Sequence, residues 1–296
     1  MARAFTSFIG VNLGGGRGKT TAIARLRTAQ AGSGAEVMEV ATRAGQAAWT
    51  DDTLVNYLAS PAPDTVLAID APLTATSCGR CERPVCPGME TCEEPAVGWL
   101  RTTGRALVQN VAVETVGGAP RSIDPHSHSG VLRAAPAQRA SVTLPQARLA
   151  PYAHRATDVV MTYQRGLLPL AALGATNGAI AARAGQLRRR LRGTGYRQHE
   201  NLIEVSPAAT VAALCGTRAA RGYKRDADAW RSRAAVLERL ELTFAPQSRF
   251  AREDVLRNDH CFDAVIAAYT AFLWARDAWP APEGVFADDG WIYAPP

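Results

Sequence analysis

The chain has 296 residues, and 47% of them are hydrophobic, which is enough to fill a sizeable core. This length suits either one domain with large insertions or two domains. Its formal net charge is +6, and nearly all positive charges are arginines, because Lys19 and Lys224 are the only lysines. The sequence lacks a secretion signal and any apolar run near about 18 residues, so we expect a cytoplasmic protein without membrane spans. The arginine excess suits an anionic partner.

The first glycine-rich stretch, GVNLGGGRGKT, is close to a nucleotide-binding P-loop but does not match it. A P-loop requires a glycine, four residues and then Gly-Lys-Ser/Thr. Gly18-Lys19-Thr20 supplies the end of the motif, but the first glycine would have to stand where Leu13 is. We therefore predict a meander of three strands with glycine-rich turns, at residues 4–13, 20–28 and 35–43. Asn12 stands at the end of the first strand.

The rest of the chain alternates between helical patterns and short apolar strands. The predicted helices cover residues 51–60, 96–112, most of 155–192, 207–215, 226–242 and 260–279. The predicted strands cover residues 65–73, 200–207 and part of the tail 284–296. Residues 96–152 are interpreted as an insertion or a mobile lid, because much of this segment is rich in Pro, Ser, Gly and Arg without a period.

The order of these elements is that of the ribonuclease H fold, an α/β fold with a mixed sheet flanked by helices. In this fold, acids from the first strand, the fourth strand and a late helix meet at one sheet edge and hold divalent metal ions. Asp70 ends an apolar strand, where packing gives no reason for a carboxylate. Asp263 begins an apolar helix, and Asp259, four residues earlier, shares its face. Glu204 is a third acid near a strand end.

Each acid also has a structural interpretation. Asp70 could cap the following turn, and Asp259 or Asp263 could satisfy backbone amides at a helix N-terminus. Glu204 could pair with an arginine. Their joint placement, in the order that the fold requires, favours a site for Mg²⁺ or Mn²⁺.

Four of the six cysteines lie in one short loop, TSCGRCERPVCPGMETCEEP. They are Cys78, Cys81, Cys86 and Cys92. In a cytosolic chain, clustered cysteines favour a metal over disulfides. Zinc accepts four thiolates, and an iron-sulfur cluster is the close competitor. We predict that residues 77–95 form a metal-binding loop beside the acid site, with a reduced, flexible loop as the alternative.

An arginine-rich segment, RAGQLRRRLRGTGYR, covers residues 183–197. Arginines at this density could follow a phosphate backbone, and a tyrosine is available for stacking on a base. The candidate contacts are Arg188, Arg189, Arg190, Arg192 and Tyr196. The alternative is a solvated helix face. His126 and His128 could add a metal ligand, but paired histidines in such a loop are more often incidental.

An ordered set of motifs resembles the domain-of-unknown-function 429 family, whose members are described as predicted nucleases with an RNase H fold. The motifs are GVNLG, AIDAPL, RATD, ENLIEVSPAAT, YKRD, DHCFDAVIAAYTA and DGWIYAPP, and they span nearly the whole chain. The resemblance implies one RNase H-like domain over residues 1–296, with acidic positions at Asp70, Glu204 and Asp263. Asn12 departs from the pattern, because the family's first strand usually ends in an aspartate there.

Three function classes follow from these features. The first is a metal-dependent nuclease, in which Asp70 and Asp263 hold the ions, Glu204 or Asp259 assists, and Asn12 weakens the site. The second is a phosphotransferase of the actin-like kinase group, which would need a second nucleotide-binding half that the sequence does not repeat. The third is a non-catalytic nucleic-acid-binding protein. DNA and RNA are equally compatible with the sequence.

Overall fold

The computed structural model describes residues 5–15, 20–29, 34–59, 64–109, 121–123, 132–134, 148–173, 178–246 and 252–296. The chain divides into two compact units. The first comprises Met1–Leu73, Gly178–Ala281 and Ile292–Pro295, and the second comprises Thr74–Asn177, Pro282–Trp291 and Pro296. The second unit therefore contains both segments that the sequence sets apart as insertions.

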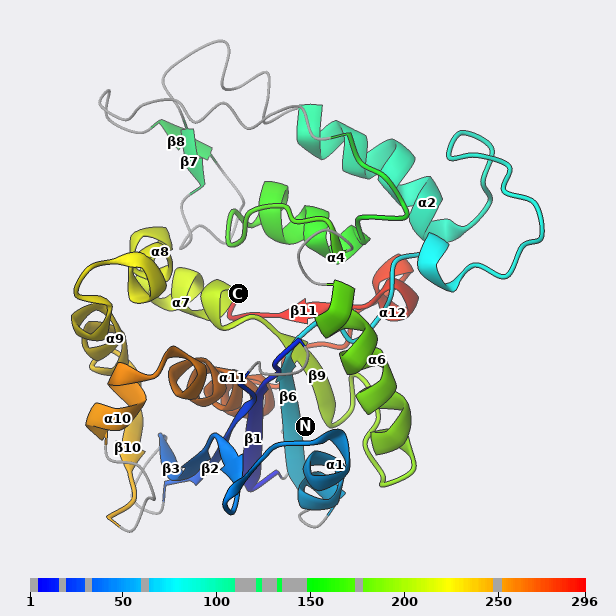
Figure 1. Ribbon diagram of the computed structural model, residues 1–296. Coiled ribbons are helices and arrows are strands. Elements are labelled where there is room, and N and C mark those ends of the chain that lie inside the picture. Colours follow the sequence, from blue (N-terminus) through cyan, green and yellow to red (C-terminus); the bar gives the residue numbers. More distant parts are fainter. Residues whose placement is uncertain are drawn as a thin grey trace. The chain divides into compact units, whose positions relative to one another are not determined.

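The first unit is built on a seven-stranded mixed sheet with the strand order β10-β3-β2-β1-β6-β9-β11 (Figure 1). The strands are β1 (Ser7–Asn12), β2 (Ala22–Thr28), β3 (Ala35–Ala41), β6 (Thr65–Asp70), β9 (Leu202–Val205), β10 (Leu242–Phe244) and β11 (Ile292–Tyr293). As predicted, β1, β2 and β3 form an antiparallel meander. Strands β6, β9 and β11 extend the sheet in parallel from β1, so their carboxyl ends share one edge.

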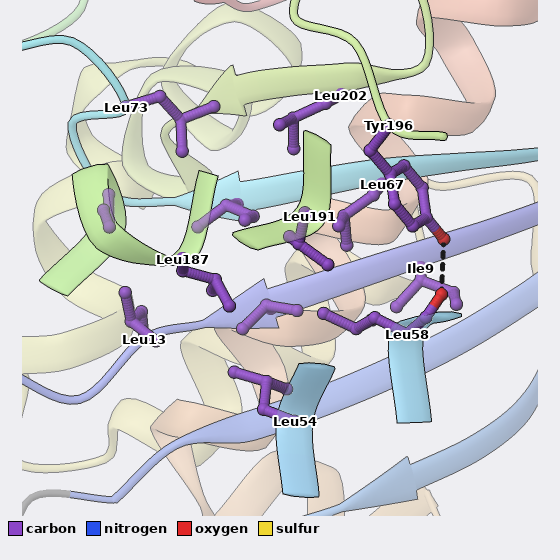
Figure 2. Packing of buried hydrophobic residues seen from close by; sticks show 14 of the residues in the cluster. Ile9, Leu13, Leu54, Leu58, Leu67, Leu73, Leu187, Leu191, Tyr196 and Leu202 are labelled. Atoms are coloured by element: carbon purple, nitrogen blue, oxygen red, sulfur yellow. Dashed lines mark hydrogen bonds between the residues drawn. The ribbon is translucent and has the colours of Figure 1, made fainter. Parts of the chain in front are cut away.

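Helices cover both faces of the central strands, which explains why the middle residues of β1 and β6 are continuously apolar and buried instead of alternating. Alternate residues of the two strands, such as Ile9 and Leu67, pack with Leu58 of α1 (Asp51–Ala59) and Leu191 of α6 (Gly178–Arg192) (Figure 2). On the other face, Phe8 meets Phe272 of α11 (Asp259–Arg276) edge to face, with ring centroids 5.5 Å apart.

The helix α11 packs directly on β1 because Gly10 has no side chain. A Cβ at Gly10 would overlap the carbonyl oxygen of Ala264 and the backbone nitrogen of Ala268. The helix begins after Asn258, whose Oδ1 accepts from the backbone N–H of His260 at 3.0 Å. Since Asn258 is the N-cap, neither of the two predicted acids of this helix has that role.

The helices α7 (Pro207–Cys215), α8 (Thr217–Arg225), α9 (Ala229–Leu237) and α10 (Arg252–Arg257) complete the helical part of the first unit. The helix predicted over 226–242 is shorter in the structure, because residues 242–244 join the sheet edge as β10. The helix α8 was not predicted from the sequence; it is mostly polar and is anchored by one buried side chain, Tyr223. A small hairpin, β4 (Arg43–Ala44) with β5 (Ala47–Ala48), turns at Gly45, whose φ of 64° favours glycine.

The second unit is mainly helical in the part that the structure describes. It contains η1 (Cys78–Arg80), α2 (Pro95–Trp99), η2 (Leu100–Gly104), α4 (Ala156–Val159), η3 (Val160–Gln164), α12 (Val285–Asp289), and a two-stranded sheet of β7 (Arg121–Ile123) and β8 (Leu132–Ala134). Its core includes Leu100, Leu149, Val159 and Tyr163. Among the described residues of the whole chain, no helix is both long and apolar enough to cross a membrane.

Candidate functional site

The structure brings together three of the predicted site residues from distant parts of the chain. Asn12 and Asp70 end the neighbouring parallel strands β1 and β6 and are register partners. The Asn12 Nδ2 donates to Asp70 Oδ2 at 2.9 Å and to Asp263 Oδ2 at 3.4 Å. An amide from β1 therefore joins the carboxylates of β6 and α11 at the carboxyl edge of the central strands.

The side chain of Asn12 has a defined orientation at this junction. Its Oδ1 lies 2.9 Å from His260 Nδ1, and its Nδ2 faces the two carboxylates. The reverse orientation would place an oxygen acceptor against carboxylate acceptors. Since Oδ1 can only accept, His260 Nδ1 donates in this contact. Asn12 thus turns a donor, not its oxygen, toward the acid pair.

Asp263 is held by two neighbouring residues of α8. The Tyr223 hydroxyl donates to Oδ1 at 3.0 Å, and Lys224 Nζ lies 2.6 Å from Oδ2. The Asp263 side chain is 2% exposed, whereas that of Lys224 is 43% exposed, so the lysine reaches the buried acid from the surface. Tyr223 and Lys224 belong to the YKRD motif, for which no role was predicted from the sequence. The signal was available, since Lys224 is one of only two lysines in an arginine-rich chain.

The acid pair is electrostatically unfavourable when both carboxylates are ionised. Burial, followed by repulsion from Asp263, raises the pKa of Asp70 to about 7, against the opposing effects of Lys224 and Asn12. Burial also raises the pKa of Asp263, although the ammonium of Lys224 opposes that shift. Lys224 balances one of the two negative charges. A second positive charge at the pair would therefore be strongly favoured.

The other two predicted acids lie around this pair. Glu204 is 2% exposed, and its Oε2 accepts from the backbone N–H of Leu73 at 2.8 Å, so it supports the turn that follows Asp70. Its charge also contributes to the raised pKa of Asp70. Asp259 is partly exposed, and its charge contributes to the raised pKa of Asp263. Both acids add negative potential at the pair.

The chemistry of the donor set suits a single hard divalent cation. Among the described residues, no group of three or more His, Cys, Asp or Glu side chains is arranged to hold a metal ion. Mg²⁺ does not need such a cage, because it commonly binds one or two carboxylates together with water and substrate phosphate. Asp70 and Asp263 fit that role. Among the described residues, these two carboxylates are too few to hold two metal ions.

The comparison with protein families gives one match. The family described as "Protein of unknown function (DUF429)" matches residues 15–285. The chain belongs to this family. The match confirms the resemblance drawn from the ordered motifs. No curated protein and no solved structure has a significant match to the chain.

The four clustered cysteines of this DUF429 protein lie in the second unit. Cys78, Cys81 and Cys86 are exposed, Cys92 is partly exposed, and all four are free thiols. Burial and the charges of the other three thiols raise the pKa of Cys78, so the four sulfurs are close enough to interact. They do not form a metal-holding geometry among the described residues. His126 and His128 lie outside the described residues.

The first turn of the cysteine loop is fixed to the tail of the same unit. Arg80, between the first two cysteines, lies 3.0 Å from the buried carboxylate of Asp289 and donates to the Asp288 carbonyl at 2.6 Å. Asp289 also accepts from Ser77 Oγ at 3.0 Å and from the backbone N–H of Ala156 at 2.7 Å. The loop therefore starts from a rigid base.

The arginine-rich segment of this DUF429 protein is largely engaged within the fold. Arg190 pairs with Asp52 of α1 at 2.7 Å, and Arg188 donates to Gln198 Oε1 at 2.7 Å. The prediction that Tyr196 stacks on a base needs correction. Tyr196 is 1% exposed and its hydroxyl donates to the Leu58 carbonyl at 3.0 Å, so its ring belongs to the core (Figure 2). Arg189 and Arg192 are exposed.

Proposed function

We propose that this protein is a metal-dependent nuclease with an RNase H-like fold, which hydrolyses phosphodiester bonds at the acid pair. The observation that carries the proposal is the meeting of Asp70 and Asp263, with the ammonium of Lys224 against them among the residues that the structure describes. Two further features support it. An antiparallel meander continues into parallel strands, and the acids come from the end of β6 and the start of α11.

Asp70 and Asp263 would hold the divalent ion, and Glu204 or Asp259 would add negative potential around it. A bound Mg²⁺ or Mn²⁺ supplies positive charge at the phosphate and lowers the pKa of water. The protein's own groups position the acids. Asn12 joins the two carboxylates, and its amide is oriented by His260. Tyr223 and Lys224 fix both oxygens of Asp263.

The substitution at Asn12 lowers the negative charge of the site by one compared with the usual DUF429 pattern. We therefore propose a low intrinsic rate and a preference for Mn²⁺ over Mg²⁺, because each lost carboxylate weakens the attraction for the cation.

A second function, nucleic-acid binding without cleavage, has one observation in its favour. The oxygens of Asp263 already have partners in Tyr223, Lys224 and Asn12, and Asp70 has the Asn12 amide. A pair satisfied in this way would gain less from a cation. The phosphotransferase alternative gains no support, because the described residues of the second unit contain only the small β7–β8 sheet.

At the four cysteines we propose one zinc ion, or one iron-sulfur cluster, per chain. Two observations support this assignment. The four thiols are free and interact electrostatically, and the short polar loop that carries them is anchored at its start by the ion pair of Arg80 with Asp289. Bound metal would order the rest of the loop. A reduced thiol set also suits a cytoplasmic location.

The nuclease proposal is tested by incubating purified protein with labelled single- and double-stranded DNA and RNA, in Mg²⁺, in Mn²⁺ and in EDTA. Cleavage that requires metal and is absent in Asp263→Asn supports a nuclease. A mobility shift without cleavage under every metal condition would instead support the binding protein, and ATP turnover would support the phosphotransferase.

A further inference from the structure

A row of three arginines lies on the surface of α8. Arg218, Arg221 and Arg225 recur at spacings of three and four residues, so they lie on one face of the helix. All three are exposed, and within the part of the chain that the structure describes no ion pair or hydrogen bond of their side chains is found.

The acids nearest in sequence to this row are engaged elsewhere. Asp226 accepts from Ser232 Oγ at 2.9 Å, and Asp228 pairs with Arg231 at 3.5 Å. The positive charge of the α8 row is therefore not balanced by the residues that follow the helix. A row of this kind attracts an anion with repeated charges.

The same helix is attached to the acid pair at its last turn. Tyr223 is buried and donates to Asp263, and Lys224 forms an ion pair with it. Arg225 follows Lys224 directly, and the other two arginines continue the row by one and two turns toward the helix start. The unpaired row thus leads away from the acids that the proposed reaction uses.

Three arginines of α6 are engaged within the fold, whereas Arg189 and Arg192 of the same helix are exposed. Arg183 and Arg190 pair with Asp51 and Asp52 of α1, and Arg188 has Gln198 as a partner. These contacts hold two helices of the core together. Binding a phosphate there would require breaking them.

We propose that α8 guides the substrate strand, with Arg218, Arg221 and Arg225 binding successive phosphates of a phosphodiester backbone that leads to the acid pair. This rests on the proposed nuclease function. The row spans about 10 Å along the helix axis, and three successive phosphates of one strand span about 7 Å at about 3.4 Å per step, a difference that the long arginine side chains can accommodate. Contacts of this kind are independent of base sequence.

The test is binding to a labelled single-stranded oligonucleotide of about 16 nucleotides, as DNA and as RNA, measured by fluorescence anisotropy in EDTA over a salt series. The first variant replaces Arg218, Arg221 and Arg225 with Gln. The matched control replaces Arg25, Arg43 and Arg105 with Gln, three exposed arginines outside α6 and α8, which removes the same charge. The melting temperature of each variant shows whether it folds. If the triple variant does not fold, the single variant Arg221→Gln is used in its place.

The α8 variant should bind at least about tenfold more weakly, and its slope of log Kd against log salt should fall by about 2, because three phosphate contacts are lost. The control should stay close to wild type. Equal weakening by both variants, normal binding by the α8 variant, or no binding by wild type would overturn the proposal. EDTA prevents cleavage, so binding and cleavage are measured separately. If wild type cleaves in Mn²⁺ but the α8 variant binds normally in EDTA, the role of α8 in guiding the strand is refuted and the nuclease proposal is not. If the α8 variant binds more weakly but wild type does not cleave in Mn²⁺, the nuclease proposal is refuted and the binding of phosphates by α8 is not.

Discussion

The Nδ2 of Asn12 donates to Asp70 Oδ2 at 2.9 Å, so an amide from β1 holds a carboxylate of β6. The amide donor stabilises the metal-free acid pair, and its neutrality limits the attraction for a cation. Replacing Asn12 by aspartate should therefore destabilise the metal-free acid pair and strengthen the binding of a cation.

Asn12→Asp should bind Mn²⁺ at least about tenfold more tightly, because an added unit charge at about 4 Å is worth a few kcal/mol near a protein surface. The same variant should melt at a lower temperature in EDTA, since a donor has become a third repelling carboxylate. Titration calorimetry with Mn²⁺ and thermal melting measure the two effects. Asn12→Ala serves as the control that removes the donor without adding charge. Unchanged Mn²⁺ affinity in Asn12→Asp would place this residue outside the metal site.

Asp70→Asn and Asp263→Asn should each reduce metal-dependent cleavage by orders of magnitude, because each removes one of the two carboxylates that would hold the ion. Asp288→Asn, which changes an exposed acid of the second unit, is the control and should cleave as wild type does. Rates are measured with labelled oligonucleotide in Mn²⁺. Cleavage that persists in both site variants would mean that these acids are structural.

The stability of the metal-free protein should depend on pH through Asp70. Its pKa is raised from 3.8 to about 7 on folding, so the folded state binds the proton more tightly than the unfolded chain does. The free energy of unfolding therefore falls as pH rises from about 4 to about 7. Asp70→Asn removes this dependence and should be more stable than wild type at about pH 8, with the difference closing toward about pH 4. Urea unfolding in EDTA at several pH values measures it, and parallel curves for the two proteins would contradict it.

Cys81→Ser and Cys86→Ser should each lose the metal of the cysteine loop, because a site with four thiolates tolerates a missing ligand poorly. Cys215→Ser changes a partly exposed cysteine of α7 in the first unit and should keep the metal. Elemental analysis and a visible spectrum of anaerobically purified protein distinguish zinc from iron. Wild-type protein that is colourless, metal-free and well folded would refute the site.

Tyr196→Phe should destabilise the protein by about 1 kcal/mol, because the buried carbonyl of Leu58 loses its hydroxyl donor. Nucleic-acid binding should not change, since the ring lies in the core. Urea unfolding and anisotropy measure the two properties. A marked loss of binding at unchanged stability would show that the ring reaches the ligand after all.

The positions of the main strands and of α11 could be predicted from local patterns, because burial imposes a regular sequence pattern on each element. The meander at β1 to β3 and the apolar strand β6 follow from β-branched runs between glycine-rich turns. The helix α8 could not be predicted in this way. Its side chains are mostly polar and only that of Tyr223 is buried, so it lacks the apolar stripe by which a helix is recognised, although its arginines recur at helical spacing.

The sequence by itself determined the family, the acidic residues at the strand and helix ends, and the clustering of the cysteines, because these depend on residue type and spacing along the chain. Only the tertiary structure decided which groups meet those acids. Lys224 and Tyr223 reach Asp263 from about 40 residues away, and Asn12 reaches it across 251. The tertiary structure also decided that Tyr196 fills the core and that the arginines of α8 are exposed. Contacts of this kind depend on how β1, β6, α8 and α11 pack, and packing is a property of the whole fold rather than of any local stretch of residues.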